Sequence, residues 1–163
     1  MALEDTLHYI IFIDSCAFYP PQKDEKLAME KLWDLDEKGV LQLEISEATD
    51  EEMERAPAEL RDRVNSRIFA LDKIGTQEEK IIMAEIKKLL FPNKEILDDG
   101  EKRDVRNLFC AQKYGCYMFV TVDKEDILNK AELIRTKLRM EVVTPTQCLG
   151  FVLGRLEVIK KYN

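Results

Sequence analysis

Apolar residues in this chain fall into two patterns, short continuous runs and longer segments with a single apolar stripe. The runs at 8–13 and 116–122 each lead into an aspartate, and "IIFI" before Asp14 has the β-branched character of a buried strand. Partial alternation predicts another strand at 40–46, and residues 141–143 predict a short last one. Stripes at helical spacing predict helices, which lie at 24–38, from about 49, at about 58–71, 76–90, 101–114, 125–138 and from 145 onward.

Local signals support several of these helix ends. Gly39 stands where a helix C-cap is expected, and Thr76 followed by Glu79 is a capping-box pattern. Strands that are separated by helices pair in parallel, with helices on both faces of the sheet. We therefore expect an α/β fold with three α/β/α layers around a mainly parallel sheet of about four to five strands. Residues 1–163 form one domain in this interpretation, with a helical segment at about 50–95.

Carboxylates recur where such a fold binds its ligands, beyond the carboxyl ends of the strands. Asp14 and Asp123 each follow a predicted strand, Asp104 lies on the packed stripe of the helix before the third strand, and Asp126 follows Asp123 by three residues. Clustered carboxylates repel one another, and a hard divalent cation offsets that repulsion. The alternative is that Asp104 and Asp126 are helix N-terminal charges and that Asp14 caps a loop.

These residues stand in two motifs that resemble the PIN-domain family of nucleases. The first is an apolar strand followed by Asp14 and Ser15. The second is a helix, a glycine and a strand, and its matching residues are Asp104, Ala111, Gly115, Thr121, Asp123 and Asp126. The chain departs from the family at Phe109 and Cys110, where small residues are usual, and by one extra residue before Asp123. "EVVTPTQCL" also resembles the last strand of the family and the helix after it.

The resemblance implies a metal-dependent endoribonuclease that hydrolyses phosphodiester bonds of single-stranded RNA. It assigns catalysis to Asp14, Glu52, Asp104 and Asp123, and the binding of Mg²⁺ or Mn²⁺ to Asp14, Asp104, Asp123 and Asp126. Ser15 and Thr121 would orient these carboxylates through hydrogen bonds. The second acid of the family stays open between Glu52, Glu51 and Glu47. The competing interpretation is a catalytically inactive PIN-like domain that binds RNA or protein.

An acidic site needs cations that attract RNA. The candidates near the predicted edge are Lys102, Arg103, Arg106, Lys124 and Arg139, and ordinary surface charge is the alternative for each. Tyr19 or Phe18 is a candidate for stacking on a base, with core packing as the alternative for Phe18. The resemblance extends to toxins of toxin–antitoxin pairs, so an antitoxin and a second copy of the chain are candidate partners beside RNA.

The composition of the chain limits the ligands and metals that the protein could bind. The net charge is −7, yet residues 1–100 carry 13 Lys and Arg against 24 Asp and Glu, whereas residues 101–163 carry 12 against 8. The acidic total argues against indiscriminate binding of polyanions, and the basic C-terminal third leaves room for local attraction of phosphates. Four cysteines without Cys-x-x-Cys spacing and a single histidine give no zinc pattern. The cysteines and the short apolar runs predict a cytoplasmic protein with no membrane partner.

Overall fold

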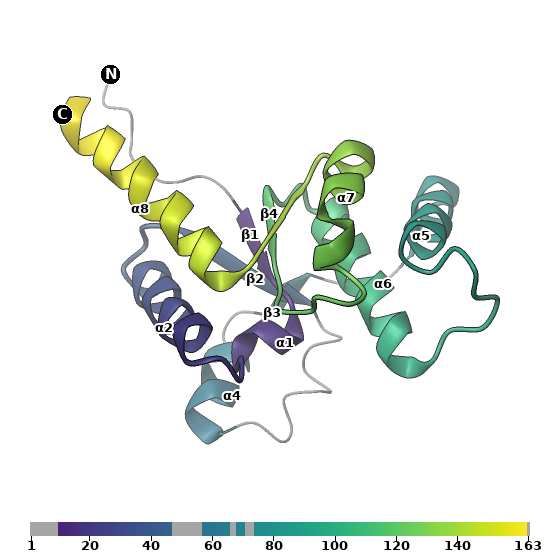
Figure 1. The fold of residues 1–163 in the computed structure, drawn as a ribbon, viewed down its shortest axis with the longest axis horizontal. Coiled ribbons are helices and arrows are strands. Elements are labelled where there is room, and N and C mark those ends of the chain that lie inside the picture. Colours follow the sequence, from purple (N-terminus) through teal and green to yellow (C-terminus); the bar gives the residue numbers. More distant parts are fainter. Residues whose placement is uncertain (1–9, 47–56, 66–67, 71–73, 163) are drawn as a thin grey trace.

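The computed structural model describes residues 10–46, 57–65, 68–70 and 74–162. Within these ranges, five strands form one sheet in the order β3-β2-β1-β4-β5, and every neighbouring pair is parallel (Figure 1). The strands are β1 (Ile10–Ile13), β2 (Gln42–Ser46), β3 (Ile68–Ala70), β4 (Met118–Val120) and β5 (Glu141–Val143). The expected α/β class with a parallel central sheet is confirmed, and β1 is its middle strand.

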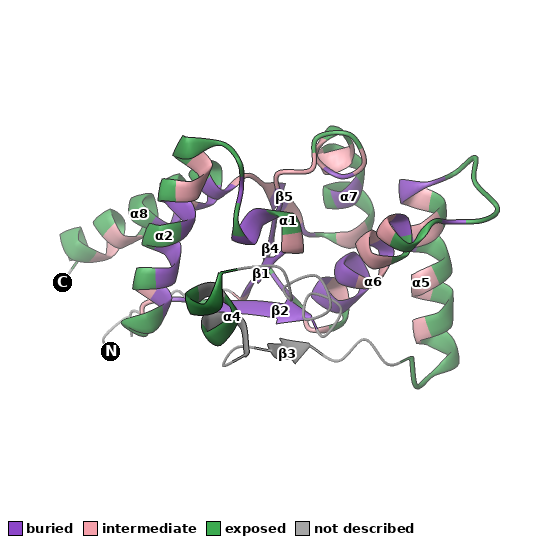
Figure 2. Ribbon diagram, turned by 90° about the horizontal axis from the view of Figure 1, so that it is seen from below, coloured by how far each residue is buried: buried purple, intermediate pink, exposed green. Residues whose placement is uncertain are grey.

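Helices cover both faces of this sheet (Figure 1). The first face carries α1 (Ser15–Phe18), α2 (Lys23–Glu37) and α8 (Pro145–Tyr162). The second face carries α5 (Gln77–Leu90), α6 (Asp99–Lys113) and α7 (Ala131–Leu138), with a short 3-10 helix at Leu128–Lys130 before α7. A further helix, α4 (Ala58–Asn65), lies near α2. The outward sides of α2 and α5 are exposed, whereas β1, β2 and β4 between the two layers are mostly buried (Figure 2).

Side-chain alternation along the central strands builds two separate cores. Ile11 and Ile13 point into the core under α2 and α8, and Phe12 points into the core under α5, α6 and α7. Phe119 on β4 stacks on Phe12, with ring centroids 5.3 Å apart and planes 6° apart. Both faces of a parallel strand are therefore apolar, which is why the sequence shows continuous apolar runs here.

Two predicted helices differ from the structure. The helix expected to reach residue 71 ends at Asn65, and Ile68–Ala70 instead pairs with β2 as an edge strand. The helix expected from residue 125 begins as a 3-10 helix only at Leu128, because Asp123 Oδ1 accepts the backbone N–H groups of Glu125 and Asp126 and holds a turn there. The helix predicted from about 49 lies outside the described residues.

Candidate functional site

Three neighbouring strands bring polar side chains to one edge of the sheet. Asp14 follows β1 directly, Ser46 ends β2, and Thr121 follows β4. All three are buried, and only 2% of the Asp14 surface is exposed. Because β2, β1 and β4 are parallel neighbours, their carboxyl ends meet at this edge.

The Asp14 carboxylate is the centre of a buried hydrogen-bond network. Its Oδ1 accepts the backbone N–H of Ser15 at 2.9 Å and the side-chain amide of Asn107 at 3.0 Å. Its Oδ2 accepts the hydroxyl of Thr121 at 2.8 Å. Asn107, on α6, in turn accepts the hydroxyl of Ser46 through Oδ1 at 2.5 Å. Neutral donors therefore compensate the burial of this charge and link β1, β2, β4 and α6.

The two residues predicted to orient carboxylates act in different ways. The Thr121 hydroxyl donates to Asp14 and accepts the backbone N–H of Asp123 at 3.1 Å, so it connects two predicted site residues. Ser15 contributes its backbone N–H to Asp14. The Cys16 thiol lies 3.2 Å from Asp14 Oδ2, and desolvation and the nearby Asp14 charge raise the pKa of this thiol. Cys16 is therefore protonated at neutral pH and acts as a further donor.

A cluster of three carboxylates lies at the same edge. Asp104 from α6, Asp123 after β4 and Asp126 in the following turn each place one carboxylate oxygen within 4.8 Å of the other two. All three residues are half-buried. Among the described residues this is the group that could hold a metal ion, and Asp14 is joined to it through Thr121 rather than being a member. Three of the four predicted metal ligands therefore converge.

Electrostatics in this acidic cluster are unfavourable for the ionised form of Asp126. Burial raises the pKa of the Asp126 carboxyl above its ordinary value, and the charge of Asp123 raises it further. Lys130 lowers the pKa of Asp126, whereas Glu101 raises it again. Oxygen ligands at this spacing suit a hard divalent cation, whose charge would offset the repulsion.

The sequence analysis did not identify Asn107 or Glu101. Asn107 is a buried amide on the sheet-facing side of α6, three residues after Asp104, and a polar residue between Val105 and Leu108 was the available signal. Glu101 is nearly buried, closes the capping box of α6 and accepts from Lys94. Glu52, Glu51 and Glu47 lie outside the described residues, so the second family acid stays a prediction.

The predicted RNA-binding residues do not form a single surface. Lys102 and Arg106 line a groove between α5 and α6 of about 550 Å³, together with Lys80 and Lys87. Lys124 is exposed directly after Asp123 and lines a hollow toward Thr144. The two remaining candidates stand elsewhere, with Arg103 half-buried on α6 and Arg139 in a hollow that includes Cys116. Arg103 and Lys124 each adjoin a residue of the acidic cluster in sequence, and Lys124 is the exposed one of the two.

Comparisons with known proteins add no identification. No protein-family model matches the chain, and no characterised protein matches its sequence. The resemblance to PIN domains therefore depends on the motif residues alone. Within the described residues, no helix is long and apolar enough to cross a membrane.

Proposed function

We propose that this protein is a metal-dependent endoribonuclease that hydrolyses phosphodiester bonds of single-stranded RNA. The observation that carries the proposal is the convergence of Asp104, Asp123 and Asp126 at the carboxyl edge of a parallel sheet. Mg²⁺ or Mn²⁺ fits this donor set because both ions prefer carboxylate oxygens and neither needs histidine or cysteine. A bound ion would lower the pKa of a water molecule and stabilise charge on the phosphoryl oxygens.

The protein side chains supply binding and orientation in this proposal. Asp104, Asp123 and Asp126 are the metal ligands, and Thr121 positions the Asp123 backbone through its hydrogen bond. Asp14 acts by fixing Thr121 and Asn107, because the Asp14 oxygens accept hydrogen bonds inside the protein. Lys124 provides a cation beside the cluster for the phosphate backbone of RNA. An antitoxin and a homodimer stay predictions from the family resemblance.

One observation favours the competing function, an inactive PIN-like domain that binds RNA or protein. Asp14 is almost fully buried, and its carboxylate receives hydrogen bonds from Ser15, Asn107 and Thr121. A carboxylate held in this way supports the local fold without taking part in turnover. The same experiment separates the two functions, because only the enzyme cleaves RNA.

The test is cleavage of end-labelled single-stranded RNA by the purified protein with Mn²⁺ or Mg²⁺. We expect cleavage that EDTA abolishes, and Asp104→Asn and Asp123→Asn should each reduce it by at least about 100-fold because a charged metal ligand is lost. Asp99→Asn is the matched control, since Asp99 is an exposed aspartate on the same helix outside the cluster.

Three results would contradict the proposed metal-dependent enzyme. Cleavage that survives EDTA, or that Asp104→Asn leaves unchanged, contradicts the proposed metal chemistry. RNA that is bound but stays intact with either metal supports the inactive binding domain. Thermal unfolding of each variant shows whether a loss of activity comes from a loss of structure.

A further inference from the structure

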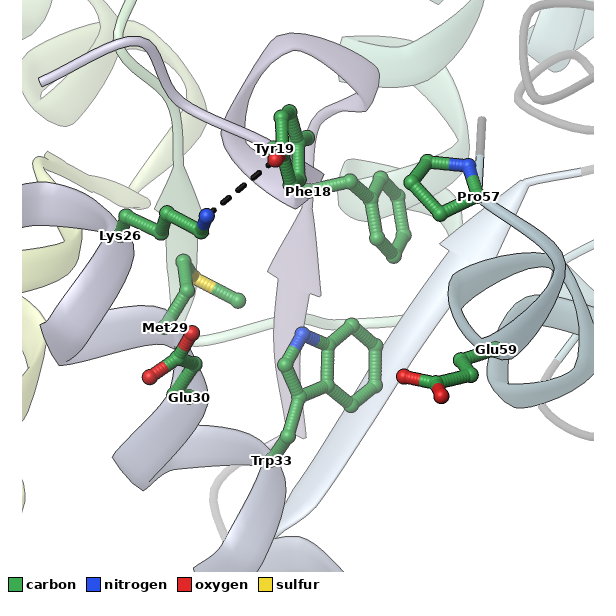
Figure 3. A pocket seen from close by; sticks show the side chains of 8 residues that line it. All are labelled: Phe18, Tyr19, Lys26, Met29, Glu30, Trp33, Pro57 and Glu59. Atoms are coloured by element: carbon green, nitrogen blue, oxygen red, sulfur yellow. Dashed lines mark hydrogen bonds between the residues drawn. The ribbon is translucent and has the colours of Figure 1, made fainter. Parts of the chain in front are cut away.

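A cavity of about 560 Å³ lies between α1, α2 and the start of α4 (Figure 3). This volume falls within the range of small-molecule sites, about 300–1,000 Å³. Aromatic residues and charged residues both line it, which distinguishes it from a purely apolar packing defect. The sequence analysis named two of its residues, Phe18 and Tyr19, as candidates for stacking on a base.

The cavity wall offers flat aromatic surface. Phe18 and Trp33 pack against each other with ring centroids 5.4 Å apart and planes 22° apart. Tyr19 is 56% exposed at the mouth, and the Lys26 ammonium lies 4.5 Å from the centre of its ring (Figure 3). Phe18 is buried, so the stacking role predicted for either residue falls to Tyr19. Aromatic rings with a neighbouring cation are the surfaces that hold unpaired bases beside a phosphate backbone.

A buried polar group also lacks a partner at this cavity. Only 2% of Trp33 is exposed, and no residue in the described part of the chain accepts a hydrogen bond from its indole N–H. In Figure 3 the indole nitrogen lies on the side of the ring toward Met29. An unpaired buried donor costs free energy, and the flexible thioether of Met29 can move aside for a ligand acceptor. All nucleobases carry such an acceptor, a ring nitrogen or a carbonyl oxygen.

The position of the cavity relates it to the acidic edge. Helix α1 begins at Ser15, directly after Asp14, and ends at Phe18. One helical turn rises about 5.4 Å, so the aromatic wall begins about one turn beyond Asp14. Thr121 links Asp14 to Asp123 of the acidic cluster, so the proposal places a base in the cavity and a phosphate at the cluster on one RNA strand.

We propose that this cavity binds one unpaired nucleobase of a single-stranded RNA, with Tyr19 stacking on the base, Trp33 donating a hydrogen bond and Lys26 contacting the adjoining phosphate. This inference rests on the proposed function for its ligand class. It goes further because it names a binding subsite on α1 and α2 that lies outside the acidic cluster.

Trp33 is the only tryptophan of the chain, so its fluorescence reports directly on the cavity. The experiment titrates the full protein in EDTA with single-stranded RNA decamers of uniform sequence, which are bound but not cleaved. We expect saturable quenching, with an affinity that falls at least fivefold in Tyr19→Ala and in Lys26→Ala. Tyr162→Ala and Lys31→Ala are matched controls, because both residues are exposed and neither lines the cavity.

A second measurement separates RNA binding from binding at the cavity. Fluorescence anisotropy of labelled RNA reports binding independently of Trp33. RNA binding without quenching, equal losses in Tyr19→Ala and Tyr162→Ala, or equal quenching by blunt duplex RNA would each overturn the base site. Asp104→Asn should keep the quenching of Trp33 while it loses cleavage, because Asp104 does not line the cavity. If the wild type never cleaves RNA but Tyr19-dependent quenching persists, the nuclease proposal fails and the base site stands.

Discussion

At the scale of single residues, two buried carboxylates differ in the hydrogen bonds that they accept. Asp14 accepts hydrogen bonds at both oxygens, whereas Glu44 on β2 accepts one, from the side chain of Gln42 at 2.9 Å. No donor in the described residues reaches Glu44 Oε2, and only 2% of Glu44 is exposed. Burial raises the pKa of the Glu44 carboxyl above its ordinary value. Hydrogen bonds thus compensate the burial of both Asp14 oxygens, whereas Glu44 Oε2 has no such compensation.

We therefore expect Glu44→Gln to stabilise the protein above neutral pH, by roughly 1–3 kcal/mol in the free energy of unfolding. The folded-state pKa of Glu44 is raised, so the wild type loses stability as pH rises from about 4.3 through that pKa. Below about pH 4 the carboxyl is protonated in both states, and the advantage of the variant should disappear. Denaturant unfolding at pH 4 and pH 8 measures this difference. Glu85→Gln, at an exposed position on α5, should show none of it.

At the scale of elements, Asn107 sets the position of α6 against the sheet. Its amide donates to Asp14 after β1 and accepts from Ser46 at the end of β2. The same helix carries Asp104 into the acidic cluster one turn earlier. The hydrogen bonds of one amide therefore fix both the packing of α6 and the placement of a predicted metal ligand.

Asn107→Ala should lower the free energy of unfolding by roughly 2–3 kcal/mol, because it leaves the Ser46 hydroxyl and one Asp14 oxygen without this partner. For a chain of this size that corresponds to a fall in melting temperature of about 5–10 °C. Asn129→Ala, at an exposed asparagine before α7, is the control. A loss no larger than that of the control would mean that α6 is positioned by its apolar contacts alone.

The elements that sequence patterns located correctly are those whose signals are local. Apolar runs gave β1 and β4, and the helix from Pro145 is present as expected. Ile68–Ala70 was missed because the helix predicted at about 58–71 included this short apolar run, which instead pairs with β2. The start of the helix before Leu138 was misplaced because the Asp123 side chain caps a turn.

Some residues of the candidate site could likewise be predicted from the sequence, and others could not. Parallel topology alone predicts that Asp14 and Asp123 reach one edge, because each follows a neighbouring strand. To place Asp104 at this edge, one must also know which side of α6 faces the sheet, and the apolar stripe of α6 indicates that side. Asn107 could not be assigned, because its role depends on two hydrogen bonds across 61 and 93 residues of sequence. That Asp14 lies in a hydrogen-bond network while the other three aspartates form the acidic cluster likewise depends on side-chain geometry.

At the scale of the whole molecule, the carboxyl edge of the sheet joins the proposed sites. The acidic cluster, the buried Asp14 network and the aromatic cavity are all reached from the ends of β1 and β4 and from α1. The chain is acidic overall, so its net charge does not offset the repulsion within the acidic cluster. A divalent ion bound there would be linked to folding, because the separated acids of the unfolded chain bind it weakly.

Mn²⁺ should therefore raise the melting temperature of the wild type, and an ion at 100 times its Kd contributes about 2.7 kcal/mol. At about 2–4 °C per kcal/mol, the expected rise is roughly 5–10 °C. Asp126→Asn should melt at or above the wild type in EDTA, since it removes a half-buried charge that Asp123 repels, and it should lose most of the rise with Mn²⁺. Asp62→Asn, on the exposed side of α4, should keep the full rise. An equal Mn²⁺ response in Asp126→Asn and the wild type would place the ion elsewhere, and the three carboxylates would then owe their proximity to the fold alone.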